Sequence, residues 1–273
     1  MGYDSKNMHY IFHIEYFDGM DLVESRKSKE KTYIDLIKQK NKDIFDFEFP
    51  ESELFEELKG LEEYHEFSLY TMYPGLLAGI GNPHQIAEPE AVKLGFNFDF
   101  VTGLPYISGS SLKGMLRSMF PEEHKKNREE LTEMIRGFLG KGKEFDVAGL
   151  VENIFEEGED VFLGGHPVVS DGKGKILQSE YVTPHLRKFK NPIPISFLKV
   201  APDVCFKFCY LLKDYKNGED VVTAEEKAGL FRELILLAGI GAKTNVGFGR
   251  FSEKKAGRNI REQSSNEKRR FGV

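Results

Sequence analysis

The sequence predicts an α+β fold, because two kinds of hydrophobic periodicity alternate along it. Apolar and polar residues alternate in four stretches, as in half-buried strands, whereas two stretches carry apolar residues at helical spacing. The strand-like stretches are residues 66–73, 160–169, 204–212 and 248–251, and the helical ones follow Ser111 and Thr223. Their order is strand, helix, strand, strand, helix, strand, which is that of a ferredoxin-like core with residues 66–253 as its span.

Residues 1–65 are expected to form a helical, acidic extension that packs on this core. Charged and apolar residues interleave from Lys27 to Leu61, as in helices broken at Pro50. Residues 41–66 hold ten acidic residues against two lysines, which indicates either a solvated face or a surface for a partner protein.

Two histidines near the N-terminus have a spacing that could suit a metal ion. Residues 8–17 are compatible with a strand or with part of a helical extension. On a helix His9 and His13 would share one face, whereas on a strand they would lie about 13 Å apart and could not share an ion. Because no further cysteine or histidine is close in the sequence, we expect no metal site.

The central stretch, Thr102–Phe120, reads TGLPYISGSSLKGMLRSMF. It is preceded by an alternating, strand-like segment, Phe96–Val101. After a turn, Ser110 or Ser111 stands where a helix needs an N-cap, and apolar residues follow at helical spacing. Lys113 and Arg117 are four apart and share the other face. A capped helix N-terminus with two cations nearby can bind a phosphate, although the same pattern also fits an ordinary amphipathic helix with solvated cations.

An insertion is expected at about residues 122–158. Its helical pattern runs from Glu129 to Glu157 and is broken around GKGK at 140–143.

Two hairpins are predicted in the second half of the chain, each joining two alternating stretches through residues typical of turns. The first is expected to pair 160–169 with 175–182 through Asp171–Gly174, and the second to pair 195–200 with 204–212 through Ala201-Pro202-Asp203.

The last predicted helix begins at Thr223, which forms a capping box with Glu226 and is followed by an inward stripe. That stripe consists of Leu230, Leu234 and Leu237. A glycine-rich loop, residues 239–249, then leads into the closing strand. Residues 254–273 hold seven basic residues against two acidic ones and few apolar residues, so we expect a basic, flexible tail.

The composition is that of a soluble protein. The chain has 273 residues, 40% apolar and 30% charged, with a net charge of −6. No apolar run approaches a membrane span and the N-terminus does not resemble a signal peptide, so a cytoplasmic location is expected. Cys205 and Cys209, on one face of a strand, would be about 13 Å apart and therefore reduced. The net acidity argues against indiscriminate nucleic-acid binding, but a local basic track remains compatible with it.

The glycine-rich loop, GIGAKTNVGFGRF, does not fit a nucleotide-binding motif. With its first glycine, Gly239, as position one, position six is Thr244 instead of glycine, and no Gly-Lys-Ser/Thr follows as in a Walker loop. We therefore expect no cofactor. A flexible backbone of this kind can lie close to a helix N-terminus or to an RNA backbone, or it can simply be a tight connection. The residues of this loop that bear on the question are two glycines and four residues that can donate hydrogen bonds: Gly241, Gly247, Lys243, Thr244, Asn245 and Arg250.

For nuclease chemistry, His185 in TPHLRKFK is the best general-acid candidate, with Arg187 nearby. His166 and His84 come next. Each of the three adjoins a proline, where a turn-stabilising or core role is more frequent than catalysis, so we expect no catalytic site.

Together, PYISGSSLKGMLR and the glycine-rich loop resemble the signature of the RAMP (repeat-associated mysterious protein) superfamily of CRISPR effector subunits. Within it, the chain is most similar to the sixth subunit of the type III-B Cmr complex. The supporting segments are GLLAGIGNPH, TGLPYISGSSLKG, YVTPHL and NPIPISFLKV, within residues 68–251. One departure is Ser108, where the family usually has proline; serine leaves the turn less rigid but keeps the cap.

The resemblance implies a ferredoxin-like core of the RNA-recognition-motif type and a non-catalytic role. The chain would cap the backbone filament at the 3′ end of the guide RNA, with Ser110, Ser111, Lys113, Arg117, His185, Arg187 and the loop residues as RNA contacts. The implied partners are guide and target RNA, the repeated backbone subunit, the small helical subunit and the other capping subunit. Two alternatives stay open: a metal-independent endoribonuclease on the same fold and a scaffold that contacts only protein.

Overall fold

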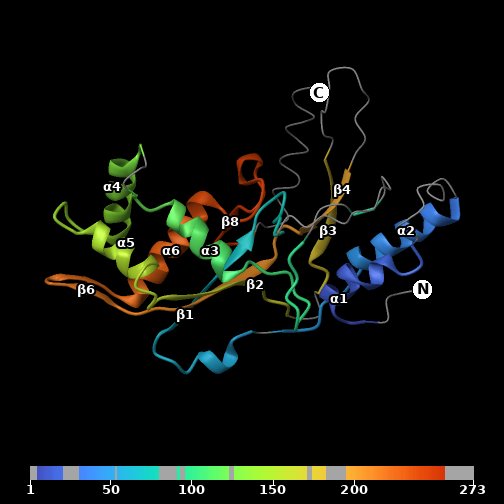
Figure 1. Cartoon of the computed structure of the whole chain (residues 1–273), viewed down its shortest axis with the longest axis horizontal. Helices are drawn as coiled ribbons and strands as arrows, with labels where there is room; N and C mark the ends of the chain where they lie inside the picture. The colour runs from blue at the N-terminus through green and yellow to red at the C-terminus, as the bar shows by residue number, and fades with distance from the viewer. Residues whose placement is uncertain are drawn as a thin grey trace, which may run out of the picture.

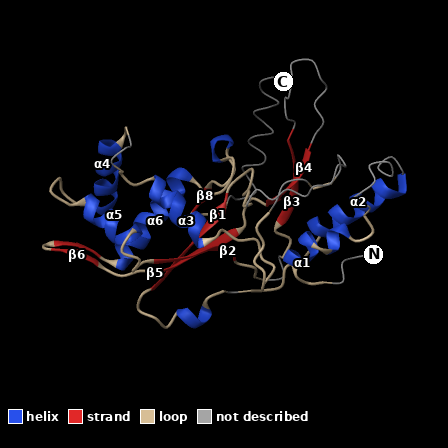
Figure 2. Cartoon of the chain, in the orientation of Figure 1, coloured by secondary structure: helices blue, strands red, loops and turns tan. Residues whose placement is uncertain are grey.

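Helices and antiparallel sheets make up the computed structural model (Figures 1 and 2). It describes residues 5–20, 31–52, 54–79, 91–92, 96–122, 126–170, 174–182 and 195–255. The α-helices in this part of the chain are α1 (Met8–His13), α2 (Lys31–Phe45), α3 (Gly109–Ser118), α4 (Arg128–Leu139), α5 (Val147–Phe155) and α6 (Ala224–Ala238). The strands are β1 (Tyr64–Thr71), β2 (Val161–Pro167), β3 (Leu177–Val182), β4 (Ile195–Val200), β5 (Cys205–Leu211), β6 (Tyr215–Asn217), β7 (Asp220–Val222) and β8 (Phe251–Ser252).

The largest sheet confirms the predicted α+β class. Its four strands stand in the order β2-β5-β1-β8, and every neighbouring pair is antiparallel. In chain order the strands and the two helices packed on them are β1, α3, β2, β5, α6 and β8. Helix α3 packs on β2 and α6 on β1, and both lie over the same face of the sheet (Figure 2). None of the described helices has the length and apolarity that a bilayer span requires.

Two helices bury apolar stripes against this sheet. Helix α3 buries Leu112 and Leu116 completely, at the spacing that predicted it. In the predicted capping box of α6, the Glu226 N–H donates to Thr223 Oγ1 at 3.1 Å and the Thr223 N–H to Glu226 Oε2 at 2.8 Å.

The stripe of α6 differs from the prediction at one position. Leu230 and Leu234 are buried as expected, but Leu237 is 52% exposed. The buried face is centred on Phe231, so Leu237, in the last turn, lies at its edge and faces away from the sheet.

Both predicted hairpins are wrong. Strand β3 pairs with β4, from Leu177 opposite Val200 to Val182 opposite Ile195, and β5 pairs with β1 and β2. The second predicted hairpin does not form because the corner after β4, residues 201–203, is hydrogen-bonded to β1. There Thr71 Oγ1 donates to the Ala201 carbonyl at 2.7 Å, and the Asp203 N–H donates to the Thr71 carbonyl at 2.7 Å.

The segment Phe96–Val101 was expected to be a strand, and this too is corrected. It forms only an isolated bridge, Phe98 opposite Pro105, followed by a turn. Asp99 Oδ1 accepts hydrogen bonds from the N–H of Val101 and of Thr102, at 3.1 and 2.7 Å. The aspartate side chain therefore bends the backbone where a strand would have continued.

The N-terminal segment is helical, which decides between the two readings left open by its sequence. Asn7 caps α1, and Met8, Ile11 and Phe12 are fully buried in the same hydrophobic cluster as the central sheet. Helices α1 and α2 lie beside β3 and β4 (Figure 1). Tyr16 follows α1 and donates to Asn41 Oδ1 on α2 at 2.7 Å. The domain boundaries assigned from the sequence remain predictions.

Three further features of the sequence can be placed. The insertion contains α4 and α5, and α4 ends where predicted, with Gly140 in the left-handed region at φ 64°. Cys205 and Cys209 are free on β5, which confirms that they form no disulfide. The rings of His9 and His13 lie 4.6 Å apart on α1, and no cluster of three metal-binding side chains occurs among the described residues. The basic tail lies outside the described residues from position 256 onward.

Candidate nucleic-acid interface

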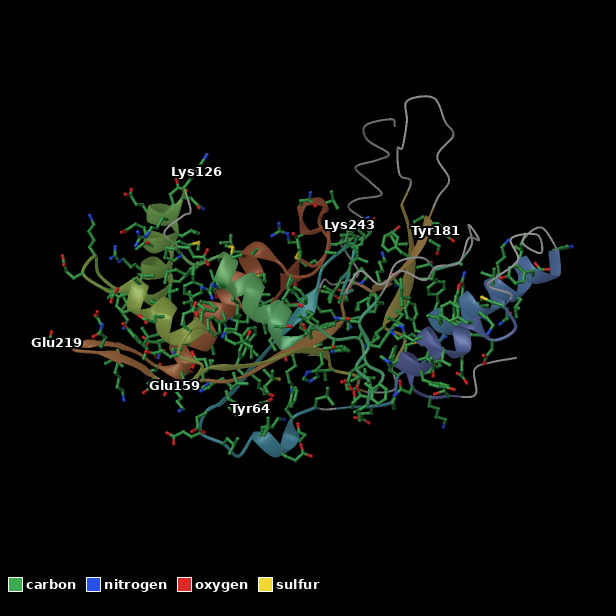
Figure 3. The ribbon with its side chains drawn as sticks, viewed as in Figure 1. Tyr64, Lys126, Glu159, Tyr181, Glu219 and Lys243 are labelled. Carbon is green, nitrogen blue, oxygen red and sulfur yellow. The ribbon has the colours of Figure 1, made fainter. Side chains whose placement is uncertain are left out.

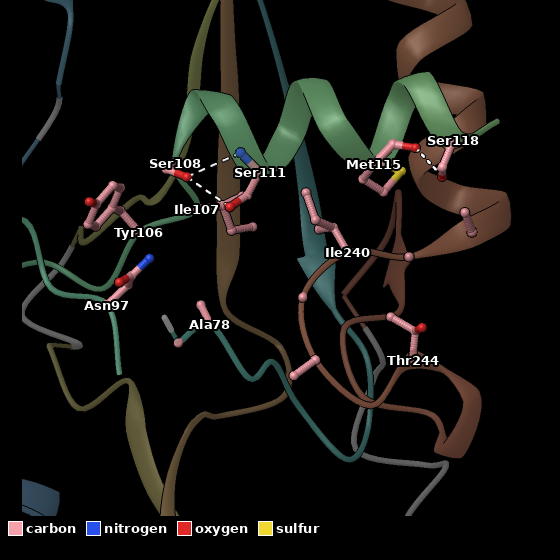
Figure 4. Close-up of a pocket in the computed structure, with 15 residues that line it drawn as sticks. Ala78, Asn97, Tyr106, Ile107, Ser108, Ser111, Met115, Ser118, Ile240 and Thr244 are labelled. Carbon is pink, nitrogen blue, oxygen red and sulfur yellow. Dashed lines mark hydrogen bonds between the residues drawn. The ribbon is translucent and has the colours of Figure 1, made fainter. Parts of the chain in front are cut away.

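A groove joins the two sequence motifs that are far apart in the chain. It has a volume of about 520 Å³ and runs between α3 and the glycine-rich loop (Figure 4). From α3 its wall is formed by Ser111, Met115 and Ser118, and from the loop by residues 238–242 and Thr244. Tertiary structure therefore places the predicted helix and the glycines on two sides of the same groove.

The N-cap of α3 is Ser108, which corrects the prediction of Ser110 or Ser111. Ser108 has extended backbone angles, φ −64° and ψ 149°, and its Oγ accepts the Ser111 N–H at 3.2 Å. Gly109 and Ser110 are already helical, so neither Ser110 nor Ser111 can be the cap. The Ser108 hydroxyl lies 3.0 Å from Ser110 Oγ and 2.8 Å from Ser111 Oγ, so three hydroxyls gather at a helix terminus with a partial positive charge.

The glycines of the loop are required by contacts within the protein. Gly241 and Gly249 have φ of 100° and 66°, and a Cβ on either would run into a main-chain carbonyl, that of Leu77 or Ile240. These carbonyls belong neither to α3 nor to a bound RNA, so at these two positions the glycine serves a tight connection within the protein. Gly247 differs, because only Pro74 Cδ lies near its Cβ position, at 3.4 Å, although its φ is 98°.

Hydrogen bonds strap the loop to the segment after β1. The Ala242 N–H donates to the Leu77 carbonyl at 2.9 Å, and the Gly249 N–H donates to the Gly75 carbonyl at 2.8 Å. Within the loop, the Ile240 N–H donates to the Gly249 carbonyl at 2.9 Å. These three hydrogen bonds fix the loop backbone, which forms one wall of the groove, against the segment after β1.

The cations on α3 point away from the groove. Lys113 and Arg117 lie roughly half a turn from the groove-lining Ser111 and Met115, because each residue of an α-helix advances by about 100°. Lys113 Nζ sits 5.7 Å from the centre of the Phe162 ring.

Arg117 is engaged with acidic residues of the insertion. Its Nη2 lies 2.5 Å from Glu156 Oε1 and its Nε 3.2 Å from Glu122 Oε1. Hydrogen bonds to Glu122 and then Glu156 raise the pKa of Arg117. These contacts join the end of α3 to the insertion. They give Arg117 a structural role, and its predicted contact with RNA stays a prediction.

One cation of the loop, Lys243, adjoins groove-lining residues in the sequence, and the other, Arg250, is bonded to the end of α6. Lys243 falls between two lining residues, Ala242 and Thr244, and its Nζ is 5.2 Å from the Phe197 ring centre. Figure 3 shows Lys243 on the side of the loop that faces β3 and β4. Asn245 is exposed beside it. Arg250, in contrast, donates from Nη1 to the Leu237 carbonyl at 2.6 Å and so caps the end of α6.

Asn97 and Tyr106 line the groove, but the sequence analysis did not predict them as site residues. Both line the groove at its end near the start of α3 (Figure 4). Asn97 lies in the segment that was predicted to be a strand. Tyr106 lies in the motif of the central stretch, in which only serines and cations were predicted as contacts. Tyr106 had one signal, its place in a segment that carried the family resemblance, whereas Asn97 had none.

Of the histidines considered for catalysis, the structure describes only His166, which does not line the groove. His166 on β2 is buried, and its ring lies 5.5 Å from that of Phe55. His84, His185 and Arg187 lie outside the described residues.

Comparison with known proteins agrees with the two motifs. Residues 68–252 match the RAMP superfamily. The CRISPR system Cmr subunit Cmr6 of Saccharolobus solfataricus is 26% identical over 166 residues, which cover 59% of this chain and 49% of that protein. Cmr6 of Pyrococcus furiosus is 27% identical over 205 residues, which cover 55% of this chain and 58% of that protein. The chain thus spans about half of the length of the curated relatives it matches.

A solved structure shares the fold. A chain in the cryo-EM structure of the type III-B Cmr-β complex bound to cognate target RNA superimposes with a TM-score of 0.53 at 22% identity, covering 91% of this chain and 88% of that one. The family match spans more than half of this chain and includes both walls of the groove. This protein therefore belongs to the RAMP superfamily and resembles Cmr6 of the type III-B Cmr complex.

Proposed function

We propose that this chain is a non-catalytic RNA-binding subunit of a type III-B CRISPR interference complex, and that it caps the backbone filament at the 3′ end of the guide RNA. The observation that carries the proposal is the groove between α3 and the glycine-rich loop. We also propose that the sheet with α3 and α6 is a ferredoxin-like core, because its strand order β2-β5-β1-β8 and its connections are those of that fold.

The chemistry of the groove suits a polynucleotide backbone. Hydroxyls at the N-terminus of α3 can donate to phosphate oxygens where the helix dipole also favours negative charge. The glycines opposite have no side chain, so a ribose-phosphate chain can approach their backbone closely. Lys243 adds a positive charge at the loop. With a net charge of −6 on the whole chain, binding should be confined to such local sites.

The proposed partners follow from the relatives. The matched proteins are Cmr6 subunits, and the matched assembly is bound to target RNA. For this chain we propose guide RNA and target RNA as nucleic-acid partners. Its proposed protein partners are the repeated backbone subunit, the small helical subunit and the other capping subunit.

The 3′-end proposal predicts a difference between two guides. The purified chain, alone and assembled with its partner subunits, should bind a full-length guide RNA more tightly than a guide shortened at its 3′ end. A guide shortened at its 5′ end is the matched control and should bind as the full-length guide does. Fluorescence anisotropy measures the affinities, and gel analysis of the same mixtures without metal reports cleavage.

The other functions predict other results. Site-specific cleavage would identify an endoribonuclease, and assembly without any RNA contact would identify a protein scaffold. Equal affinity for guides shortened at either end would contradict the assignment to the 3′ end.

Salt dependence should locate the phosphate contacts. Lys243→Ala is expected to weaken guide binding and to reduce the slope of log K against log salt by about one, because one phosphate contact is lost. Lys113→Ala removes the same charge from the opposite face of α3, and we expect its effect to be smaller. Binding measured across a range of salt concentrations compares the two. A larger loss of slope from Lys113→Ala would place the RNA on that opposite face.

A further inference from the structure

One polar side chain that lines the groove has its hydrogen-bonding groups free for a ligand. Asn97 is only 9% exposed as a residue, and no side-chain hydrogen bond of its carboxamide occurs within the part of the chain that the structure describes. Figure 4 shows this side chain directed into the space beneath α3. The carboxamide is not one of the fully buried unpaired groups, so it is accessible from the groove. A ligand in the groove can therefore complete its hydrogen bonds.

The backbone holds Asn97 in a fixed position. Its N–H donates to the Ala78 carbonyl at 2.7 Å, and its carbonyl accepts the Tyr106 N–H at 3.2 Å. The neighbouring Phe98 is buried and bridges to Pro105. The carboxamide therefore belongs to a rigid frame and is presented to the groove before any ligand arrives, which lowers the entropic cost of binding.

The chemistry of Asn97 fits a nucleobase better than a phosphate. A carboxamide offers a donor and an acceptor side by side, whereas phosphate oxygens only accept and would leave Oδ1 unmatched. A base edge presents both, and the amino group and N7 of adenine are the common bidentate partners of asparagine. The half-buried ring of Tyr106 lines the groove next to it and can stack on a base.

Phosphate chemistry lies within the same cavity. Ser108 and Ser111, at the N-terminus of α3, line the groove together with Asn97 and Tyr106. The cavity volume of about 520 Å³ falls within the range of pockets that hold small ligands. A single unstacked nucleotide could thus place its phosphate at the helix N-terminus and its base at the far end.

We propose that Asn97 is a base-reading residue, and that the groove captures one unstacked nucleotide of the bound RNA with a preference for adenine. This inference rests on the proposed RNA-binding function. It adds sequence discrimination at one position to a subunit whose other contacts, with backbone and hydroxyl groups, are independent of sequence.

The test measures affinity of the full chain for short homopolymers of adenine, cytosine or uracil ribonucleotides. The wild type should prefer the adenine oligomer, and Asn97→Leu should reduce that preference about tenfold while leaving affinity for the other two unchanged. Because adenine stacks well by itself, the change in preference on mutation is the result that counts. Asn127→Leu is the matched control, since Asn127 is exposed at the start of α4 and makes no capping hydrogen bond.

Thermal melting separates recognition from a structural role. Because the Asn97 carboxamide makes no side-chain hydrogen bond among the described residues, Asn97→Leu should melt no lower than the wild type. Asn97→Asp keeps the shape but replaces the donor by an acceptor, and it should lose the adenine preference too. An unchanged preference in Asn97→Asp, or equal wild-type affinity for all three oligomers, overturns the inference and leaves the proposed function standing. Failure of the wild type to bind any RNA overturns both.

Discussion

Replacing Asp160 by leucine is expected to lower the free energy of unfolding by about 3–5 kcal/mol, because it leaves a buried ammonium group without its counter-ion. Asp160 precedes β2, and its Oδ2 lies 2.7 Å from Nζ of Lys227 on α6. The side chains of both residues are 0% exposed. Lys227 also donates to Asn153 Oδ1 on α5 at 2.7 Å, so the pair connects the inserted helix to the central sheet and α6.

The reverse substitution should behave similarly. Lys227→Met leaves the Asp160 carboxylate with the Lys213 N–H, at 3.0 Å from Oδ1, but without a positive charge. The double variant Asp160→Leu/Lys227→Met removes both charges and is expected to recover most of the lost stability, because apolar residues of similar volume often replace buried pairs without loss.

Urea denaturation of the four proteins completes a double-mutant cycle and measures the coupling. Lys42→Met is the matched control, since Lys42 pairs with Asp46 at 2.6 Å on the surface of α2, with side chains 68% and 49% exposed. Its denaturation midpoint should hardly move. If Lys227→Met unfolds at the same urea concentration as Lys42→Met, the buried pair does not carry this stability.

Gly249→Val should both destabilise the protein, by roughly 3 kcal/mol, and abolish guide binding. At φ 66° a valine is strained, and its Cβ would overlap the Ile240 carbonyl. The Gly249 N–H is also bonded to the Gly75 carbonyl. If the loop moved to relieve this overlap, it would lose its hydrogen bond to the segment after β1, and the wall of the groove would be displaced. Melting and anisotropy on the same sample measure both effects.

Two other glycines provide the controls. Gly114→Ala lies in the exposed interior of α3, where nothing stands within 4 Å of the added carbon, and it should raise helix stability slightly without affecting binding. Gly247→Val has room for its Cβ, so its cost should come mainly from the positive φ. If Gly247→Val folds but loses binding, Gly247 contacts RNA directly. A stable Gly249→Val protein that binds guide RNA would show that the groove does not need the hydrogen bonds that hold the loop to the segment after β1.

Local sequence determined most of the helices and their ends. The capping box at Thr223 and Glu226 and the stop at Gly140 depend on hydrogen bonds and backbone angles within a few residues, so they could be predicted from neighbouring letters. The same holds for the buried stripe of α3, which follows from helical spacing. The two motifs that later met in the groove could also be identified, although not their contacts.

Strand pairing and the orientation of side chains were decided only by the tertiary structure. The two predicted hairpins did not form: β2 and β3 each pair with another strand, and Thr71 on a distant strand binds the corner at residues 201–204. The side chain of Arg117 forms ion pairs with Glu122 and Glu156 on the face of α3 away from the groove. Gly241 and Gly249 are necessary because a Cβ at either position would overlap a backbone carbonyl. Asn97 became a candidate only when folding placed it in the wall of the groove beside the start of α3. Each of these features depends on atoms brought together from distant parts of the chain, and no local pattern of residues encodes such contacts.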